Sequence, residues 1–170
     1  MKDLILIGGA AGSGKTTLAK RLAEHYGVPW ISTDQIRSIL EVEDEDHMVR
    51  LKKTWKGTLG LVKHYHPWEG AIIEGTAILP ECIAQDLKED DHVKVLFLRY
   101  SSEEEILKVI EERSKLPWIN TKTEEQKKRK ANEVSEFNEM IIETAHQYKY
   151  SCIQGSEDAL FESALSHLKY

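Results

Sequence analysis

The chain has 170 residues, of which 41% are hydrophobic and 31% charged, a composition typical of a globular domain rather than a disordered or fibrous chain. Its 23 lysines and arginines against 29 aspartates and glutamates give a formal net charge of −6, which argues against a nucleic-acid coat or a basic membrane binder. Two cysteines, Cys82 and Cys152, are too few for a disulfide scaffold or a four-ligand zinc site. No apolar run approaches the roughly 20 residues of a membrane span, and the first apolar stretch is too short for a signal peptide. We expect one soluble, cytoplasmic domain over residues 1–170.

The first half of the chain alternates strand-like and helix-like patterns. The run Leu4–Ile7, followed by glycines, is typical of a strand buried on both faces of a parallel sheet. Gly57 and Gly60 leave open whether the third helical pattern is continuous. The expected elements are, in order, a strand at 4–7, a helix after Lys15 that ends at Gly27, a strand at 28–32, a helix at 33–40, an acidic stretch at 41–46 and a helix at 48–62.

The second half repeats the alternation. Ser102 with Glu105, and Thr123 with Gln126, have the spacing of capping boxes that open helices. The helix after Thr123 is expected to bury one face made of Ala131, Val134, Phe137, Ile141, Ala145 and Tyr148. The expected elements are strands at 71–73, 93–98 and 151–154, and helices from Pro80, from Ser102 to about 113, from Thr123 and from Ser156. Five alternations of strand and helix favour an α/β fold of three layers, a parallel sheet with helices on both faces.

The segment Gly9–Thr16 matches the phosphate-binding pattern G-x-x-x-x-G-K-[ST] at every fixed position. Glycines let the backbone N–H groups turn toward phosphate oxygens, and the helix N-terminus adds partial positive charge. Lys15 is expected to bridge the β- and γ-phosphates, and the Thr16 hydroxyl to hold Mg²⁺. The predicted nucleotide-binding residues of this segment are Gly9, Ala10, Ala11, Gly12, Ser13, Gly14, Lys15, Thr16 and Thr17.

Two further motifs extend a resemblance over most of the chain. The segment Ser32–Arg37 reads S-x-D-x-x-R, and Ile72–Pro80 reads I-I-E-G-T-A-I-L-P. With the P-loop before them, they resemble small-molecule P-loop kinases, in particular 2-phosphoglycerate kinase-like, zeta-toxin-like and polynucleotide 5′-kinase-like proteins. The resemblance implies a P-loop NTPase fold, a five-stranded sheet ordered 2-3-1-4-5, and phosphorylation of a hydroxyl by ATP. No Asn-Lys-x-Asp motif is present, which disfavours a GTPase.

The acceptor side is expected to use residues that follow the second and third strands. Asp34 accepts or orients the acceptor hydroxyl, unless it merely caps a helix. Arg37, one helical turn later, suits an anion of the acceptor, unless it simply pairs with Asp34. Glu74 holds Mg²⁺ through water or binds the acceptor, unless it forms an internal salt bridge with Lys15. Gly75 and Thr76 are also predicted to bind the acceptor, and residues 41–69 to form a helical insertion on this side.

A basic segment in the second half is predicted to act as the lid. The lid spans 113–125, with Arg113 contacting the nucleotide and Arg129 contacting the phosphoryl group, although charge runs are often only solvated helix faces. Trp118 is a candidate for the lining of the pocket. The resemblance places Gly155 and Ser156, after the last strand, beside the adenine.

Taken together, the sequence predicts a kinase that transfers the γ-phosphoryl group of ATP, with Mg²⁺, to a hydroxyl of a small anionic metabolite. Two other kinase readings stay open, a polynucleotide 5′-kinase and a nucleoside or nucleotide kinase. A fourth reading is a non-catalytic ATP-binding sensor module. We expect no membrane partner, and a nucleic-acid partner only under the polynucleotide 5′-kinase reading.

Overall fold

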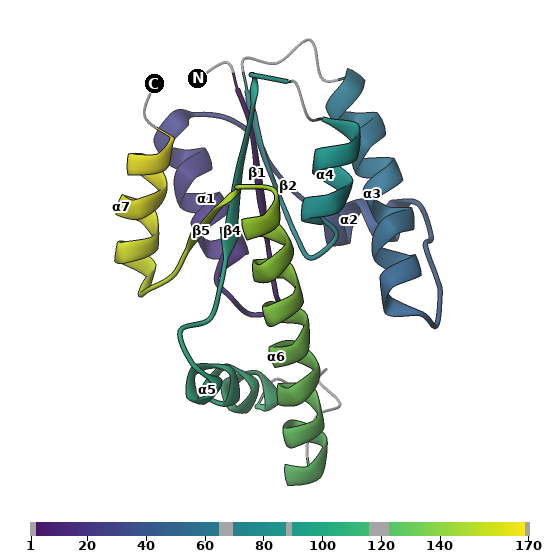
Figure 1. The fold of residues 1–170 in the computed structure, drawn as a ribbon, viewed down its shortest axis with the longest axis vertical. Coiled ribbons are helices and arrows are strands. Elements are labelled where there is room, and N and C mark those ends of the chain that lie inside the picture. The colour runs from purple at the N-terminus through teal and green to yellow at the C-terminus, as the bar shows by residue number, and fades with distance from the viewer. Residues whose placement is uncertain (1–2, 65–69, 88–89, 116–122, 169–170) are drawn as a thin grey trace.

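A computed structural model describes residues 3–64, 70–87, 90–115 and 123–168 (Figure 1). Strands and helices alternate along the chain as the sequence predicted. The elements are β1 (Leu4–Gly9), α1 (Lys15–Tyr26), β2 (Trp30–Ser32), α2 (Thr33–Ile39), α3 (His47–His64), β3 (Ala71–Glu74), α4 (Pro80–Asp86), β4 (Val93–Leu98), α5 (Glu103–Ser114), α6 (Glu124–Gln147), β5 (Ser151–Ile153) and α7 (Glu157–His167).

The five strands form one parallel sheet in the order β2-β3-β1-β4-β5, which confirms the predicted fold and strand order. The register aligns the carboxyl ends of the first three strands. Glu74 of β3 lies opposite Ile7 of β1 on one side and Ser32 of β2 on the other. The loops that follow these strands therefore start at one edge of the sheet, where open α/β folds place their ligands.

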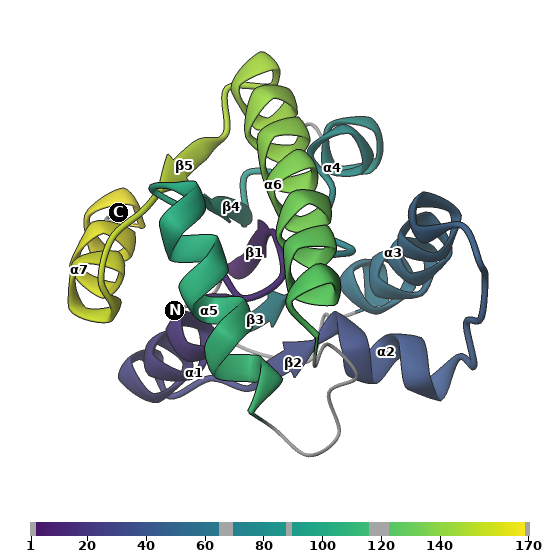
Figure 2. The same ribbon diagram turned by 90° about the horizontal axis from the view of Figure 1, so that it is seen from below.

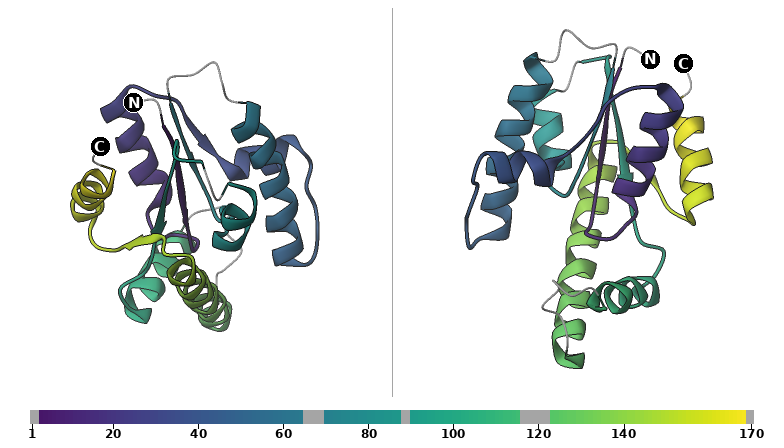
Figure 3. Two further views of the ribbon diagram at one scale, coloured as in Figure 1. Left: turned by 45° about the horizontal axis from the view of Figure 1, so that its top comes forward. Right: turned by 180° about the vertical axis from the view of Figure 1, so that it is seen from behind.

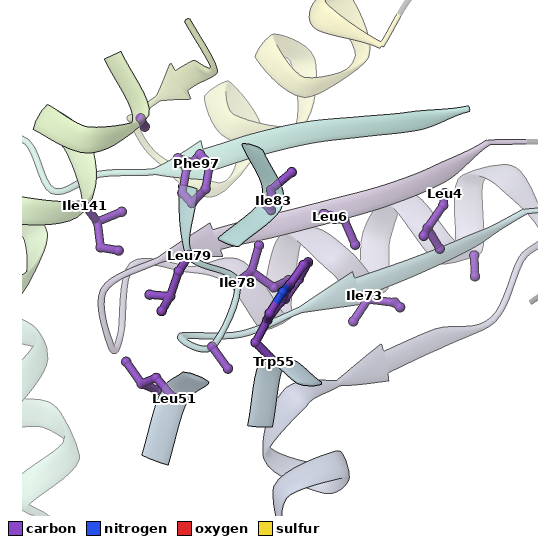
Figure 4. Close-up of a cluster of buried hydrophobic side chains, with 13 residues drawn as sticks. Leu4, Leu6, Leu51, Trp55, Ile73, Ile78, Leu79, Ile83, Phe97 and Ile141 are labelled. Carbon is purple, nitrogen blue, oxygen red and sulfur yellow. The ribbon is translucent and has the colours of Figure 1, made fainter. Parts of the chain in front are cut away.

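Helices cover both faces of the sheet because its central strand is apolar on both sides. Ile5 and Ile7 of β1 pack in a cluster with α1 and α7, whereas Leu4 and Leu6 pack in a cluster with α3, α4 and α6. The left view of Figure 3 shows these layers. Figure 4 shows the second cluster, in which Trp55 of α3 lies beside the residues of β1 and β3.

Helices α5 and α6 extend beyond the carboxyl edge of the sheet. Figures 1 and 2 show them side by side at that end, with much of α6 projecting past the strands. A third apolar cluster joins them to the loop after β1. Its buried members are Ala10, Tyr100, Ile106, Ile110, Ala131 and Val134. The loop after β1 thus lies against a wall of two helices as well as against the sheet.

Two local predictions are corrected by the structure, whereas Ser156 caps the last helix as predicted. The Ser102 hydroxyl accepts a hydrogen bond from Glu105 N, but the Glu105 carboxylate accepts from Ser101 N at 2.7 Å, one residue before the position that a capping box requires. Ser156 is the N-cap of α7 without a side-chain bond to it. Tyr148 ends α6 as its C-cap and is 45% exposed, so it lies outside the buried face.

Helix α3 is continuous through both of its glycines. At Gly57 a side chain would collide with Leu40, so a glycine there lets α2 and α3 approach closely. By contrast, the Thr123–Gln126 capping box forms as predicted.

Some predicted features lie outside the described residues. These are Trp118, residues 65–69 of the predicted helical insertion, and the part of the predicted lid between Lys115 and Thr123. Among the residues that the structure does describe, no helix is long and apolar enough to cross a membrane.

Candidate functional site

The loop between β1 and α1 has the backbone conformation that its glycines allow. Gly12 and Gly14 have φ values of +86° and +90°, a left-handed region that other residues rarely adopt. A side chain on Gly12 would also collide with the Tyr100 hydroxyl and with Val109 of α5. Gly14 is the N-cap of α1, so the loop leads directly into a helix N-terminus, where free N–H groups attract anions.

Lys15 is buried at the centre of this loop, with 6% of its surface exposed. Its Nζ donates a hydrogen bond to Ala10 O at 2.6 Å. The pKa of Lys15 falls from 10.5 to about 8, because burial, aided by the positive charge of Arg113, outweighs the opposing effects of Glu74 and Asp34. A buried ammonium with one carbonyl partner is poorly compensated, which suits a site that receives phosphate oxygens.

Thr16 and Glu74 bring two hard oxygen donors together beside Lys15. The Thr16 hydroxyl donates to Glu74 Oε1 at 3.1 Å, and Glu74 is only 3% exposed. Lys15 bonds Ala10 instead of forming a salt bridge with Glu74, so the structure does not support the alternative of an internal ion pair. Hydroxyl and carboxylate oxygens are ligands that Mg²⁺ prefers, with water completing its shell. The donor set therefore fits Mg²⁺, although the described parts of the chain contain no group of three or more acidic, histidine or cysteine residues that could hold a metal ion.

Ser13 adds a second sign of an anion site. Its Oγ is buried and has no hydrogen-bond partner in the structure. A buried hydroxyl without a partner is uncommon in proteins. An orphaned hydroxyl and a buried ammonium in a glycine-rich loop fit the phosphates of a nucleotide.

A large cavity of about 860 Å³ lies in front of the loop. It is bounded by the loop, by the ends of β2 and β3 and by α3, α5 and α6. Its walls include Ala11, Gly12, Gly14, Lys15, Thr16, Thr17, Asp34, Glu74, Gly75, Thr76 and Arg113 from the predicted site. Gly9, Ala10 and Ser13 shape the loop from behind. The structure thus brings most predicted donor and acceptor residues to one cavity.

A smaller cavity of about 200 Å³ adjoins the large one. Asp34, His47, Arg50 and Thr76 line both of them, whereas Arg37 lines the smaller cavity alone. The two cavities therefore meet at Asp34 and Thr76. The smaller one contains two guanidinium groups within a few residues of a carboxylate.

The side chain of Asp34 is available to the two cavities, because Ser32 and not Asp34 caps the N-terminus of α2. Ser32 is the N-cap of α2, and its hydroxyl accepts from Asp34 N at 3.3 Å. The side chain of Asp34 is 76% exposed and stands 3.7 Å from Arg37 Nε. Arg37 therefore forms the ion pair with Asp34 and also lines the smaller cavity, while its predicted contact with an acceptor anion stays a prediction.

His47 and Arg50, at the start of α3, were not singled out from the sequence. The Arg50 guanidinium donates to Asp44 O at 2.6 Å, which holds it in the acidic turn before the helix. The His47 ring lies 5.4 Å from the ring of Phe137 on α6, so α3 and α6 meet across the cavity. Partial desolvation, followed by the charges of Arg50 and Lys130, lowers the pKa of His47, and the imidazole is neutral at pH 7.

The cation that α6 contributes to the large cavity is Lys130, not Arg129. Lys130 lines the cavity and pairs with Glu133 at 2.9 Å. Arg129 is 80% exposed, pairs with the same glutamate at 3.7 Å and is not among the lining residues. The helical phase could have separated them, because Lys130 precedes the buried Val134 by four residues and shares its side of the helix.

Gly155 and Ser156 lie at the N-terminal end of α7 and do not line either cavity. Their predicted contact with adenine stays a prediction. Cys82 and Cys152 are half-buried free thiols, and burial raises the pKa of both, which keeps them protonated and unreactive.

Comparison with known proteins agrees with a P-loop domain in the first part of the chain. Residues 4–66 match the family model described as an AAA domain. The 2-phosphoglycerate kinase of Methanococcus vannielii is 26% identical over 187 aligned positions, which cover 89% of this chain and 59% of that protein. This chain therefore spans about three fifths of the relative's length.

Solved structures show the same fold. Shikimate kinase from Bacteroides thetaiotaomicron superposes with a TM-score of 0.67 and 16% identity over 99% of both chains. A gluconokinase from Sinorhizobium meliloti gives a TM-score of 0.62 and 17% identity over 98% of this chain and 91% of that one. The chain has a P-loop kinase-like α/β fold and is similar to P-loop small-molecule kinases, as its motifs predicted.

Proposed function

We propose that this chain is a kinase that transfers the γ-phosphoryl group of ATP to a hydroxyl of a small anionic metabolite. The observation that carries the proposal is the junction of the two cavities. The P-loop lysine lines the large cavity, Arg37 lines the smaller one, and Asp34 and Arg50 line both. This arrangement provides separate places for a phosphoryl donor, a reacting hydroxyl and an anionic group of the acceptor.

The donor side uses the loop before α1. The Lys15 ammonium and the N–H groups of the loop bind the phosphates and balance their charge as the terminal group departs. Thr16 and Glu74 are the residues that would hold Mg²⁺, which when bound would neutralise charge on the phosphate oxygens. Arg113 and Lys130, which also line the large cavity, add positive charge from the α5 and α6 side.

The transfer step uses Asp34. The acceptor hydroxyl oxygen forms a bond to the γ-phosphorus while the bond from that phosphorus to the β–γ bridging oxygen breaks, leaving ADP. The hydroxyl proton passes to the Asp34 carboxylate, which positions the oxygen beforehand. Its neighbour Arg37 pairs with this carboxylate, its Nε lying 3.7 Å from Asp34 Oδ1.

The smaller cavity supports an anionic acceptor. Arg37 and Arg50 both line it, and planar guanidinium groups bind carboxylates and phosphates through paired hydrogen bonds. The relatives are named for 2-phosphoglycerate, shikimate and gluconate, which are hydroxyl-bearing anions. The volume of about 200 Å³ suits a small group of this kind better than a nucleic-acid end. Residues 41–64, which contain α3, form the acceptor side in this proposal.

The test is transfer from γ-labelled ATP to a panel of acceptors. We expect transfer to small hydroxy acids or their phosphates, and its loss in Lys15→Met. Lys20→Met is the matched control, because Lys20 is an exposed lysine of α1 whose ammonium lies over the Trp30 ring instead. Transfer to a polynucleotide 5′-end or to a nucleoside alone would replace the metabolite with one of those acceptors. ATP binding without transfer to any acceptor would contradict the enzyme and favour a sensor.

A further inference from the structure

Tyr100, the second residue after β4, lies directly behind the phosphate loop. It is only 6% exposed, and its hydroxyl donates a hydrogen bond to Ala11 O at 2.7 Å. Burial raises the pKa of Tyr100 to about 12, so the hydroxyl keeps the proton that it donates. None of the roles described above uses this side chain.

The bond fixes the orientation of one peptide group of the loop. Ala11 C=O and Gly12 N–H belong to the same trans peptide and point in opposite directions. With its carbonyl held by Tyr100 on the α5 and α6 side, this peptide directs its N–H away from that side. Gly12 itself lines the large cavity.

Among the described residues, no other contact holds the Ala11–Gly12 peptide as firmly as the Tyr100 hydroxyl does. Gly12 has a φ of +86°, and glycine adopts positive and negative φ with similar ease. The peptide before it can therefore rotate at little cost unless a partner holds its carbonyl. In the described structure that partner is the Tyr100 hydroxyl.

Tyr100 is in turn held by the helices that surround the cavity. Its backbone N–H donates to Asn138 Oδ1 of α6 at 3.1 Å, and its ring belongs to the cluster that joins α5, α6 and Ala10. A side chain on Gly12 would touch Tyr100 and Val109, and would come within 3.8 Å of the Arg113 guanidinium carbon. The tyrosine thus connects the loop to α5 and α6, the helices that carry Arg113 and Lys130 of the large cavity.

We propose that Tyr100 is a positioning residue of the phosphate site, which holds the Ala11–Gly12 peptide so that the Gly12 N–H donates to the phosphoryl donor. This inference rests on the proposed function for the identity of that anion. A preorganised donor gains its effect from needing no reorganisation when charge develops in the reaction. Loss of the tyrosine hydroxyl frees the peptide without removing the N–H itself.

The experiment compares wild type with Tyr100→Phe, which keeps the buried ring. We expect kcat for phosphoryl transfer to fall about tenfold, less than the 10²–10³-fold that follows removal of a donor itself, with the acceptor KM unchanged. We also expect the ¹⁵N–¹H resonance of Gly12 to move downfield when a non-hydrolysable ATP analogue and Mg²⁺ bind to wild type. In Tyr100→Phe this shift shrinks, while the thermal midpoint falls by only a few degrees.

Tyr150→Phe is the matched control, because Tyr150 is a half-buried tyrosine that packs on Phe97 away from both cavities. It is expected to leave kcat and the Gly12 shift unchanged. A purely structural role for Tyr100 predicts lower stability with a wild-type Gly12 shift and kcat, and that result overturns the proposal. The proposal is also overturned if the Gly12 resonance of the wild type does not shift when the ATP analogue is added, and this test needs no variant. If wild type phosphorylates no acceptor, the kinase proposal fails while the Gly12 shift still tests Tyr100.

Discussion

The two halves of the site are built in different ways. On the nucleotide side, Lys15 and Glu74 are 6% and 3% exposed, and the sheet edge and the glycine backbone fix their positions. On the acceptor side, the Asp34 and Arg37 side chains are 76% and 41% exposed, and they stand on a helix of seven residues. Burial makes the first half rigid, whereas the second half consists of long side chains near solvent.

This difference separates phosphate binding, which is common to many nucleotide-binding proteins, from the recognition of one acceptor. In the proposed site, phosphates are recognised by backbone N–H groups and a buried ammonium. These groups suit the phosphates of any nucleoside triphosphate. In the proposed site, the acceptor is recognised by partly exposed arginines, a histidine and hydroxyls, which substitution can change without unfolding the sheet. We therefore expect variants of the nucleotide side to abolish activity and variants of the acceptor side to change mainly the acceptor KM.

Replacement of Lys15 by methionine tests the nucleotide side most severely. Without the ammonium, charge on the transferring group loses its buried partner, and we expect kcat/KM for ATP to fall about 10³-fold. Steady-state transfer assays measure the effect, with Lys20→Met as the control variant. Activity within tenfold of wild type would mean that Arg113 or Lys130 balances the charge of the transferring group. The buried Lys15 would then not be essential to the nucleotide side.

Asp34→Asn tests the reacting group at the junction. An amide cannot take the hydroxyl proton, so we expect kcat to fall about 10²-fold or more, with the affinity for an ATP analogue unchanged. Glu45→Gln, in an exposed part of the neighbouring acidic segment, is the control. Equal losses of kcat and of nucleotide affinity in Asp34→Asn would assign Asp34 to the nucleotide side instead.

The nucleotide side was predictable because its determinants are local in sequence. Eight consecutive residues specify the loop, and strand–helix alternation specifies where its sheet edge lies. The pairing of Glu74 with Thr16 needed the further step that parallel strands align their ends. Those steps follow from general rules of α/β folds.

The other walls could not be read in the same way, because they depend on how distant helices dock. His47 and Arg50 reach the cavity only through the packing of α3 on the sheet, and Lys130 only through the phase of α6. Position along the sequence gave Arg129 instead of its neighbour. Tyr100 had no sequence signal at all, since its partner Ala11 lies 89 residues away.

Lys15→Met also has an expected effect on stability, and this one is an increase. Burial lowers the pKa of Lys15 from 10.5 to about 8, so below pH 8 the native state carries a charge that the unfolded chain solvates better. At 1.36 kcal/mol per unit, the penalty near pH 7 is about 3 kcal/mol, and methionine removes it. Chemical denaturation of the nucleotide-free proteins measures the difference.

The pH dependence identifies the cause. Between pH 8 and 10.5 the unfolded chain binds a proton that the native state lacks, so wild-type stability rises with pH in this window relative to the variant. Most of the difference between the two proteins should be gone by pH 10.5. A constant difference from pH 7 to 10.5 would attribute it to packing rather than to the buried charge.

Arg50→Ala tests whether the smaller cavity binds the acceptor's anion. Loss of one half-buried guanidinium contact should raise the acceptor KM about tenfold, or 1.4 kcal/mol, and leave the ATP KM unchanged. Lys53→Ala is the control, since Lys53 bonds Asp44 Oδ2 on the same turn at 2.9 Å but lines neither cavity. A rise in the ATP KM instead would place Arg50 on the nucleotide side.

The smallest expected effects come from two matched helix caps. Ser32 caps α2 on the acceptor side and Thr123 caps α6, each in a capping box with a glutamine. Replacing either with alanine should cost about 1 kcal/mol of stability, measured by thermal unfolding. Ser32→Ala also removes the bond to Asp34 N, so it should raise the acceptor KM a few-fold, an effect that Thr123→Ala should not share. If both variants change the acceptor KM equally, α6 positions the acceptor as strongly as α2 does, and the acceptor side extends across the cavity to the helix that carries Lys130.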